Sequence, residues 1–342
     1  MPTILEKVSL QPYNSLALPA EAEYFCSVED RAELLAALDF AHSRGLSVTP
    51  LGGGSNIVLA GDIAGLVIRV DLRGVSHRVE GAFVDVTFAA GEGWHYQVQQ
   101  CLQQGWYGLE NLSLIPGNMG AAAIQNIGAY GVELADLFVS LRAIDKQSGE
   151  LLEFDKAACE FGYRDSLFKN AGRDRYIIVD ICLRLSTLAQ INVQYPALQT
   201  VIDQRRDSGA EITPELVGAM VCQIRSSKLP DPSVVPNAGS FFKNPIISQG
   251  QALELSRQYP QMPRYPQANG DSKVPAGWLI EHCGLKGAVR GPVGVHQQQA
   301  LVLVNSGGGT GAQLLALAEE VRIAVLQHFA IDLDIEPRVY GG

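Results

Sequence analysis

The sequence predicts an α+β protein in which three regions follow one another along 342 residues. Residues 1–70 alternate helix and strand signals, residues 71–212 are richest in strand signals, and residues from 213 onward alternate helices with short strands. Three closely spaced prolines, Pro230, Pro232 and Pro236, follow the first helix of the third region. A chain of this length has room for two or three domains, so we expect each region to form its own part of the fold.

The first region contains one helix between strand signals. Ser27–Asp30 resembles a capping box, and Leu34, Leu38 and Ala41 follow at helical spacing until Gly45 ends the helix. Strands are expected at residues 48–51 and 66–72. The earlier of these strands runs directly into a glycine-rich segment.

The second region combines one amphipathic helix with several strands. After a turn at Gly91–Gly93, the apolar residues Trp94, Val98, Cys101 and Leu102 share one helical face. A long loop rich in small residues and a hairpin turn are also expected. The loop covers residues 115–131, the turn residues 147–149, and the strands residues 84–89, 137–144, 151–154 and 176–185.

The third region begins with a helix that Thr213 caps and that has Pro214 in its first turn. Its apolar stripe is Leu216, Met220, Val221 and Ile224. Later helices are expected at residues 251–258, 276–283 and, after the glycines of 307–311, 314–325. Strands are expected at residues 300–304 and 331–340, and the last of these contains Glu336.

Composition narrows the function classes. Charged residues make up 18% of the chain and hydrophobic residues 47%, which favours a large core over disorder. The net charge of −10, without basic clusters, argues against nucleic-acid or anionic-membrane partners. No apolar run approaches the roughly 18 residues that span a bilayer, and residues 1–10 lack a signal pattern. Six scattered cysteines without a CxxC pair argue against a disulfide framework or a metal site. We expect a cytoplasmic monomer.

Two glycine-rich loops suggest a nucleotide cofactor. Gly52–Asn56 follows a strand, and such a loop can turn several backbone N–H groups toward one phosphate; the alternative is a plain turn. The second loop, Ile115–Gly131, holds four glycines and four alanines in 17 residues, so its backbone can lie against a large flat ligand. Its alternative is tight packing between two sheets. The first loop matches neither the usual phosphate-loop fingerprint nor the dinucleotide fingerprint. Because the two loops lie in different regions, they could clasp an extended dinucleotide between them.

The segment Asn237–Pro245 combines a serine, two phenylalanines, a lysine and an asparagine. A glycine beside Ser240 lets a ligand or another backbone come close. Phe241 and Phe242 could shield a site from water, while Lys243 and Asn244 could fix a polar substrate. The alternative is a turn with a buried aromatic pair.

Five motifs in order resemble one family. The segments LGGGSN, IPGNMGAAAIQNIGAYG, FGYRDSLFK, NAGSFFKNP and IEPRVY are similar to those of the UDP-N-acetylenolpyruvoylglucosamine reductases, flavoenzymes of bacterial peptidoglycan precursor synthesis and hence of cell-wall growth, cell shape and division. The resemblance runs from about Leu10 to Gly341. It implies a two-lobed FAD-binding part of the vanillyl-alcohol-oxidase type and a third α/β domain for the substrate. The first lobe would be residues 1–70 with the C-terminal strand at about 331–342, the second lobe residues 71–212, and the substrate domain residues 213–330.

The resemblance also implies a reaction. NADPH reduces FAD, and the reduced flavin passes a hydride to the methylene carbon of UDP-N-acetylglucosamine enolpyruvate, after which the neighbouring carbon needs a proton. Ser240 matches the proton donor, Arg164 the arginine that holds the substrate carboxylate, and Glu336 a glutamate beside that carboxylate. Glu336 is either protonated or orients Arg164 or a water. The alternatives are a surface ion pair of Arg164 with Asp165 and an exposed strand-end Glu336.

Further residues match binding positions of the family. We expect the following residues to bind FAD: Gly52, Gly53, Gly54, Ser55, Asn56, Pro116, Gly117, Gly120, Gln125, Asn126, Gly128, Tyr130, Gly131 and Arg338. The substrate residues would be Tyr195, Lys228, Asn244, Tyr265 and Gln299. The segment Arg264–Ala268 looks like the substrate-closing loop of the family's first type. Three of these residues have an alternative without a role in binding. Lys228 could be an ordinary lysine at a helix end, Tyr195 a tyrosine in a strand and Asn244 an asparagine in a turn.

Two other functions compete with this one. The first is a different flavin oxidoreductase of the same broad fold, such as an alcohol oxidase with covalent flavin. No histidine stands in either glycine-rich loop, and His42 and His95 lie on helix-like stretches, so we expect FAD to be bound non-covalently. The second is a flavin- or nucleotide-sugar-binding sensor, which would not need Ser240, Arg164 and Glu336 together.

Overall fold

The computed structural model describes residues 1–341, which divide into two compact units. The first unit comprises Met1–Val8, Ala22–Gly54 and Ile63–Ser227, and the second comprises Ser9–Glu21, Ser55–Asp62 and the chain from Lys228 onward. The three-part division expected from the sequence stays a prediction. The first unit takes most of the two regions expected at residues 1–212 and also the start of the third, residues 213–227. The second unit takes the rest of the third region together with two short early segments.

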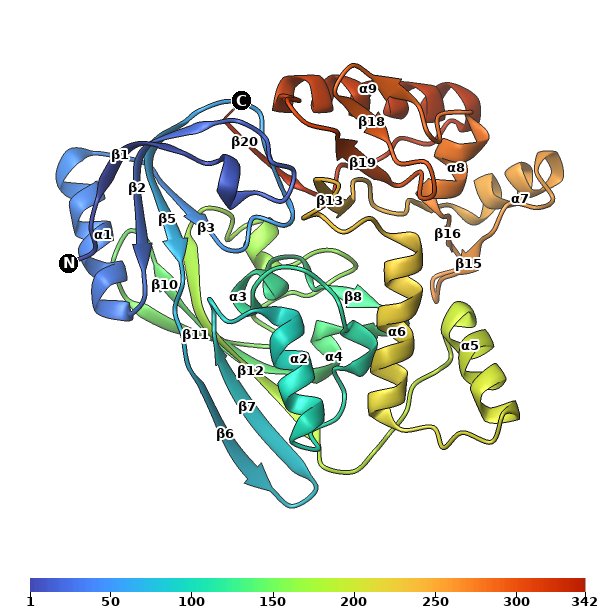
Figure 1. Cartoon of the computed structure of the whole chain (residues 1–342), viewed down its shortest axis with the longest axis horizontal. Helices are drawn as coiled ribbons and strands as arrows, with labels where there is room; N and C mark the ends of the chain where they lie inside the picture. Colours follow the sequence, from blue (N-terminus) through green and yellow to red (C-terminus); the bar gives the residue numbers. More distant parts are fainter. Residues whose placement is uncertain (342) are drawn as a thin grey trace. The chain divides into compact units, whose positions relative to one another are not determined.

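A four-stranded sheet in the order β1-β2-β5-β3 carries α1 in the first unit (Figure 1). Its elements are β1 (Leu5–Ser9), β2 (Glu21–Val28), α1 (Arg31–Arg44), β3 (Val48–Leu51) and β5 (Ile63–Val70). The expected capping box at Ser27 is wrong, since Ser27 belongs to β2 and the carboxylate of Asp30 accepts from Glu33 N instead. Gly45 ends α1 in the left-handed region, as expected. β5 begins earlier than expected because it is a mostly buried strand that pairs in parallel with both β2 and β3.

A five-stranded antiparallel sheet in the order β11-β10-β12-β7-β6 forms the rest of the first unit's framework. The predicted strands and hairpin turn are confirmed here, with Gly149 at φ 73° between β10 and β11. Both sheets share one core, to which Leu38, Ile68, Val86 and Ile144 contribute. The strands are β6 (Val75–Glu80), β7 (Phe83–Ala89), β10 (Phe138–Asp145), β11 (Leu151–Asp155) and β12 (Tyr176–Ser186).

Helices and two short strands lie between these strands or follow the last of them. The expected loop at residues 115–131 contains two helical turns and a strand, because its small residues allow tight turns. Tyr195 precedes α5 as its N-cap residue, so the alternative of a strand tyrosine is wrong. These elements are α2 (Trp94–Gln103), η2 (Glu110–Leu112), α3 (Met119–Ala122), η3 (Ala123–Gln125), β8 (Gly128–Ala129), β9 (Val132–Glu133), α4 (Leu134–Leu137), η4 (Leu167–Lys169), α5 (Pro196–Asp207) and α6 (Pro214–Lys228).

The second unit is built on the sheet β13-β19-β18-β17, against which α9 packs, and α8 packs against α9 (Figure 1). A small sheet, β14-β16-β15, and the parallel pair β20-β4 complete it. Its elements are β4 (Ile57–Leu59), β13 (Asn237–Ser240), β14 (Ile246–Ile247), α7 (Gln249–Gln258), β15 (Tyr265–Pro266), β16 (Ser272–Lys273), α8 (Ala276–His282), β17 (Val289–Arg290), β18 (Val293–Val295), β19 (Val302–Asn305), α9 (Gly311–Phe329) and β20 (Arg338–Tyr340).

The expected strand at residues 331–340 is wrong over most of its length. Only Arg338–Tyr340 pair as a strand, so Glu336 lies outside it. Pro337 has no N–H to donate, and the N–H of Glu336 instead donates to the carbonyl of Phe241 at 2.9 Å. β19 also begins two residues later than expected. Among residues 1–341, no helix is long and apolar enough to cross a bilayer.

Candidate functional site

The two glycine-rich loops contact each other within the first unit. A Cβ atom added to Gly53 would lie 2.5 Å from Asn118 Oδ1 and 3.1 Å from Gly117 Cα, and one added to Gly52 would lie 3.7 Å from Ala121. Gly53 is therefore required by the close approach of the second loop. Within residues 1–341, the backbone N–H groups of Gly52, Gly53 and Gly54 donate no hydrogen bond. An anion nest needs such free donors.

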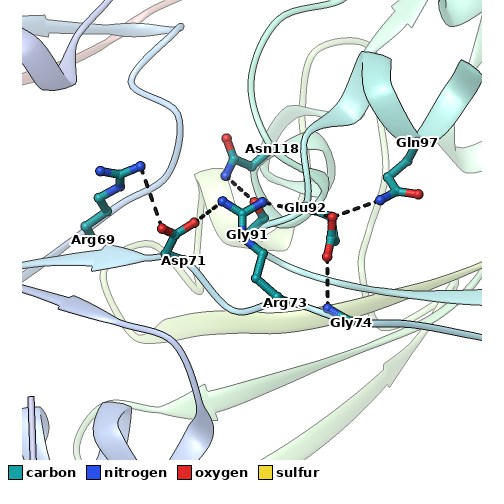
Figure 2. A network of polar contacts seen from close by, with 8 residues as sticks. All are labelled: Arg69, Asp71, Arg73, Gly74, Gly91, Glu92, Gln97 and Asn118. Carbon is teal, nitrogen blue, oxygen red and sulfur yellow. Dashed lines mark hydrogen bonds and ion pairs between the residues drawn. The ribbon is translucent and has the colours of Figure 1, made fainter.

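A polar network holds the start of the second loop (Figure 2). Asn118 Nδ2 donates to Gly91 O at 2.9 Å, so the side chain that contacts Gly53 is fixed from the other side. The carboxylate of Glu92 accepts from Gly74 N at 2.9 Å and from Gln97 Nε2 at 2.8 Å. These bonds tie the loop to α2 and to the chain that leads into β6.

Two arginines surround the same network. Arg73 forms an ion pair with Asp71, and its Nη1 lies 4.0 Å from Glu92 Oε2. Arg69 Nη2 lies 3.7 Å from Asp71 Oδ2 (Figure 2). Carboxylates and guanidinium groups balance here, so the network serves as a support for Asn118 rather than as a site for an anion.

Three of the expected site residues in the first unit have a left-handed backbone. The φ angles are 46° at Asn126, 49° at Tyr130 and 54° at Arg164. Such conformations cost about 1–3 kcal/mol each for residues other than glycine and persist where surrounding contacts enforce them. Strain of this kind clusters at functional sites, which supports the expected role of this part of the chain.

The amide of Asn126 enforces one of these conformations. Its Nδ2 donates to Glu133 Oε2 at 2.8 Å and to Gly162 O at 3.0 Å, and its Oδ1 accepts from Ala135 N at 2.9 Å. The side chain is buried and all its hydrogen-bonding groups are used. We infer that Asn126 shapes the loop, so its expected contact with a cofactor would have to come from its backbone. Gln125 Oε1 accepts from Lys169 Nζ at 3.2 Å.

Arg164 lies beside the end of the second loop. Its Nη2 donates to Gly128 O at 2.8 Å, and a Cβ atom added to Gly128 would lie 3.3 Å from Nη1. Tyr130 packs edge to face on Tyr195, with ring centroids 5.2 Å apart. The first unit therefore brings together the arginine expected to hold the substrate carboxylate, the expected cofactor residues Gly128 and Tyr130, and the expected substrate residue Tyr195.

Arg225 joins this group, and the sequence analysis assigned it no role. Its Nε donates to Leu114 O at 3.2 Å, and no carboxylate of residues 1–341 forms an ion pair with it. Burial lowers the pKa of Arg225, the nearby Arg164 lowers it further, and Tyr130 and Cys222 oppose this. Only its position in the sequence could have indicated a role for Arg225. It follows Val221 by four residues, so a charged side chain lies near the apolar stripe of α6. Two neighbouring guanidinium groups favour an anionic ligand.

His95 lies close to the same arginine. Its Nδ1 accepts from Leu114 N at 2.9 Å, which requires the nitrogen to be unprotonated. Burial lowers the pKa of His95, and the charge of Arg225 lowers it further. The neutral ring thus fixes the strained Leu114, whose φ is 58°, at the start of the second loop.

In the second unit, Ser240 lies on β13, and Glu336 lies on a neighbouring segment of the same polypeptide. Glu336 N donates to Phe241 O at 2.9 Å, and Phe241 N donates to Leu301 O at 2.8 Å. The hydroxyl of Ser240 makes no hydrogen bond to any other group of residues 1–341, so it keeps its proton available to a ligand. The rings of Phe241 and Phe242 are fully buried and pack edge to face at 5.4 Å. The aromatic pair is therefore part of the core.

Other expected substrate residues have contacts of their own in the second unit. Asn244 Oδ1 accepts from Ala276 N at 2.9 Å and so fixes the start of α8. Gln299 Oε1 accepts from Leu301 N at 3.4 Å, and the carbonyl of Leu301 in turn accepts from Phe241 N. Tyr265 is 45% exposed on β15, within a short hairpin instead of the expected loop. The hairpin pairs Tyr265 with Lys273.

Three remaining positions are defined by the backbone. Lys228 is the last residue of α6, as its helix-end alternative requires. Arg338 begins β20, where its N–H donates to Asn56 O at 3.0 Å and its guanidinium lies 4.6 Å from the ring of Tyr340. Asn56 and Arg338 are thus adjacent, although they are far apart in sequence.

Comparison with known proteins shows which families the chain resembles. Residues 22–155 match the family described as FAD binding domain, and residues 231–340 match the C-terminal domain of UDP-N-acetylenolpyruvoylglucosamine reductase. The chain is 47% identical over 338 residues to the UDP-N-acetylenolpyruvoylglucosamine reductase of Pseudomonas aeruginosa, covering 98% of each protein. It is also 47% identical over 335 residues to that of Chromobacterium violaceum, covering 97% of each.

A solved structure shares the fold. The crystal structure of UDP-N-acetylenolpyruvylglucosamine reductase from Thermus caldophilus superposes with a TM-score of 0.68 at 23% identity, covering 99% of this chain and 100% of that one. The expected α+β class with an FAD-binding part is confirmed by these matches.

Proposed function

The chain belongs to the UDP-N-acetylenolpyruvoylglucosamine reductase family, and from this we propose that it reduces UDP-N-acetylglucosamine enolpyruvate to UDP-N-acetylmuramate with NADPH. The observation that carries the proposal is full-length similarity to the relatives, combined with Arg164, Ser240 and Glu336 standing in the family's motifs. The reaction would serve peptidoglycan precursor synthesis in the cytoplasm.

The residues of the first unit fit an FAD molecule. Gly53 and Gly120 lie so close to neighbouring chain that a Cβ atom would come within 2.6 Å of another atom, and Gly52–Gly54 offer unused N–H groups that suit a diphosphate. When bound, FAD would supply the two-electron chemistry that links NADPH to the substrate. The glycine-rich loops and Tyr130 would hold it without a covalent bond, and His95 is already engaged by Leu114.

Arg164 would bind the carboxylate of the enolpyruvyl group. Its planar guanidinium suits a carboxylate, and Arg225 adds a second positive charge nearby. Negative charge grows toward this carboxylate during reduction, so fixed cations stabilise the transition state more than the ground state. In a protein of net charge −10, such local cations must outweigh the repulsion of an anionic substrate.

Ser240 would donate its hydroxyl proton to the carbon that carries the carboxylate, and it would regain a proton from water. Glu336, on the chain bonded to Phe241, would orient a water or the carboxylate-binding arginine, or act in its protonated form. Tyr195, Lys228, Asn244, Tyr265 and Gln299 would bind the diphosphate and sugar. We further propose that the protein acts as a monomer.

Colour provides the test of this function. The purified protein is expected to be yellow, to bleach when NADPH is added without oxygen, and to regain its colour when the enolpyruvyl UDP-sugar follows. Bleached protein that stays colourless with this substrate would contradict the proposal. Replacing NADPH by NADH measures the nucleotide preference, and light scattering of the purified protein measures its mass in solution.

A further inference from the structure

The strand that carries Ser240 contains a β-bulge. Asn237 pairs with Val304 and Ser240 pairs with Val302, so three steps along β13 match two steps along β19. The extra residue is accommodated at Gly239, whose φ of 69° favours glycine. Side chains alternate between the two faces of a strand, and a shift of one residue moves each side chain to the other face. The bulge therefore decides on which face of the sheet the hydroxyl of Ser240 lies.

The amide of Asn237 stabilises this bulge. Its Oδ1 accepts from Gly239 N at 2.8 Å, which closes a turn around Ala238. Its Nδ2 donates to Val235 O at 2.8 Å and to Pro230 O at 3.1 Å. Asn237 is only 2% exposed, so water cannot replace a lost partner.

The backbone of Asn237 is fixed as well. Its N–H donates to Ser15 O at 3.0 Å, and its carbonyl accepts from Ser15 Oγ at 2.7 Å. Every hydrogen-bonding group of the residue thus has a partner inside the second unit. No other side chain of similar size offers one acceptor and two donors in this geometry.

We infer that Asn237 is the positioning residue of Ser240: by bonding Gly239 and the proline-rich turn, it sets the direction from which the serine donates its proton. This inference rests on the proposed function, because it gives Ser240 the role of proton donor. It adds a requirement that Asn237 matter for the step that protonates the substrate and not for the reduction of the flavin by NADPH.

The variant Asn237→Asp tests the inference with little change in shape. The carboxylate keeps the acceptor for Gly239 N but turns an oxygen toward the two carbonyls that Nδ2 now bonds. We expect reoxidation of the reduced flavin by the enolpyruvyl UDP-sugar to slow about tenfold or more at pH 8, because a buried partner is lost. Flavin reduction by NADPH, followed in the same stopped-flow instrument, should stay within about twofold of the wild type.

The pH dependence of flavin reoxidation distinguishes a positioning role of Asn237 from a general loss of stability in the variant. A buried carboxyl that faces two carbonyls has a raised pKa, and once protonated it can donate to one of them. Reoxidation by the Asn237→Asp variant should therefore recover as the pH falls from 8 to 6, relative to the wild type at each pH. A merely destabilised protein would show no such recovery.

Asn305→Asp is the matched control. Asn305 is 1% exposed on β19, its Nδ2 donates to Leu16 O at 2.9 Å, and its Oδ1 accepts from Gly307 N and Gly309 N. Asn305 makes the same kinds of hydrogen bonds as Asn237 and lies in the same unit, but it holds the glycine-rich segment that precedes α9. This variant should lose thermal stability without a selective loss of reoxidation. If it shows the same selective loss, the inference is wrong.

A second readout does not depend on turnover. The amide proton of Gly239 should exchange slowly in the wild type and at least tenfold faster in Asn237→Ser, whose shorter side chain cannot hold all three bonds. Equal slowing of both half-reactions in Asn237→Asp, or a fast-exchanging Gly239 in the wild type, would overturn the inference. A wild-type flavin that the substrate never reoxidises would instead refute the proposed function, and with it the role given to Ser240.

Discussion

Ser240 carries the most specific expectation at the scale of single residues. Its hydroxyl has no partner within residues 1–341, so Ser240→Ala removes a proton donor without breaking a hydrogen bond of the protein. General acid catalysis contributes about 10²–10⁴-fold, and we expect substrate-driven reoxidation of the flavin to fall by that factor. Reduction by NADPH should be unchanged in rapid-mixing experiments.

The control for that substitution is Ser233→Ala. The hydroxyl of Ser233 donates to Asp231 Oδ1 at 2.7 Å in the exposed turn before β13, and its loss should leave both half-reactions intact. If the flavin of Ser240→Ala is reoxidised at a near-normal rate, Ser240 is not the proton donor. A water molecule bound by Glu336 would then be the next candidate.

His95 gives a residue-scale expectation about pH. Its pKa lies below the ordinary value of 6.5 because of burial and Arg225, so the folded protein takes up a proton at this site less readily than the unfolded chain. The stability that the neutral ring contributes is complete above pH 6.5 and is lost as the pH falls from there toward the lowered pKa. Urea unfolding at several pH values should show this decline, and His95→Gln should flatten it. If the free energy of unfolding depends on pH in the same way in the wild type and in His95→Gln, the decline does not come from His95.

Sequence patterns predicted some of the site residues better than others. Gly53 stands in a quoted motif, and the close approach of Asn118 explains why only glycine fits. Arg225 and Asn237 were not assigned roles, because their importance depends on burial and on partners distant in the chain. The bond from Ser15 Oγ to Asn237 O joins residues 222 positions apart, and no local pattern contains such a contact.

The contact between the two glycine-rich loops gives an expectation at the scale of elements. Gly53→Ala would place a Cβ atom 2.5 Å from Asn118 Oδ1 and 3.1 Å from Gly117 Cα, and the backbone cannot yield easily. We expect a loss of about 1–3 kcal/mol in stability, together with weaker retention of FAD. Chemical unfolding and the ratio of flavin to protein absorbance measure the two effects.

Gly52→Ala is the comparison within the same loop. Its new Cβ atom would meet nothing closer than Ala121 at 3.7 Å, an ordinary van der Waals contact. It should cost clearly less stability than Gly53→Ala. If both variants lose the same amount of stability, the close contact with Asn118 is not the cause of the loss in Gly53→Ala.

Elements with strong periodicity were predictable, while those set by tertiary pairing were not. The apolar stripe of α6 and the alternating strands β7 and β12 follow from local spacing. The boundary errors at β5 and β20 arise because pairing with distant strands decides where a strand starts and ends. The same holds for the bulge in β13, which exists only relative to β19.

At the scale of the whole molecule, the second unit is assembled from three separate stretches of chain. Asn237 and Asn305 bond to Ser15 and Leu16, and β20 pairs with β4. Gly311, the first residue of α9, packs so closely on Leu59 that a Cβ atom would lie 1.9 Å from its carbonyl oxygen. The long C-terminal stretch therefore lacks partners for buried polar groups when it stands alone.

We expect a fragment of residues 228–342 to remain largely unfolded, since several unpaired buried groups at about 1–3 kcal/mol each exceed much of a domain's net stability of about 5–15 kcal/mol. Near-ultraviolet circular dichroism should show no fixed aromatic packing for Phe241 and Phe242 in the fragment, in contrast to the full chain. Joining residues 9–21 and 55–62 to this fragment through flexible glycine–serine linkers should restore a cooperative urea transition. A fragment of residues 228–342 that unfolds cooperatively without them would show that the early segments are dispensable, and that the sheet around β19 alone holds Ser240 in place.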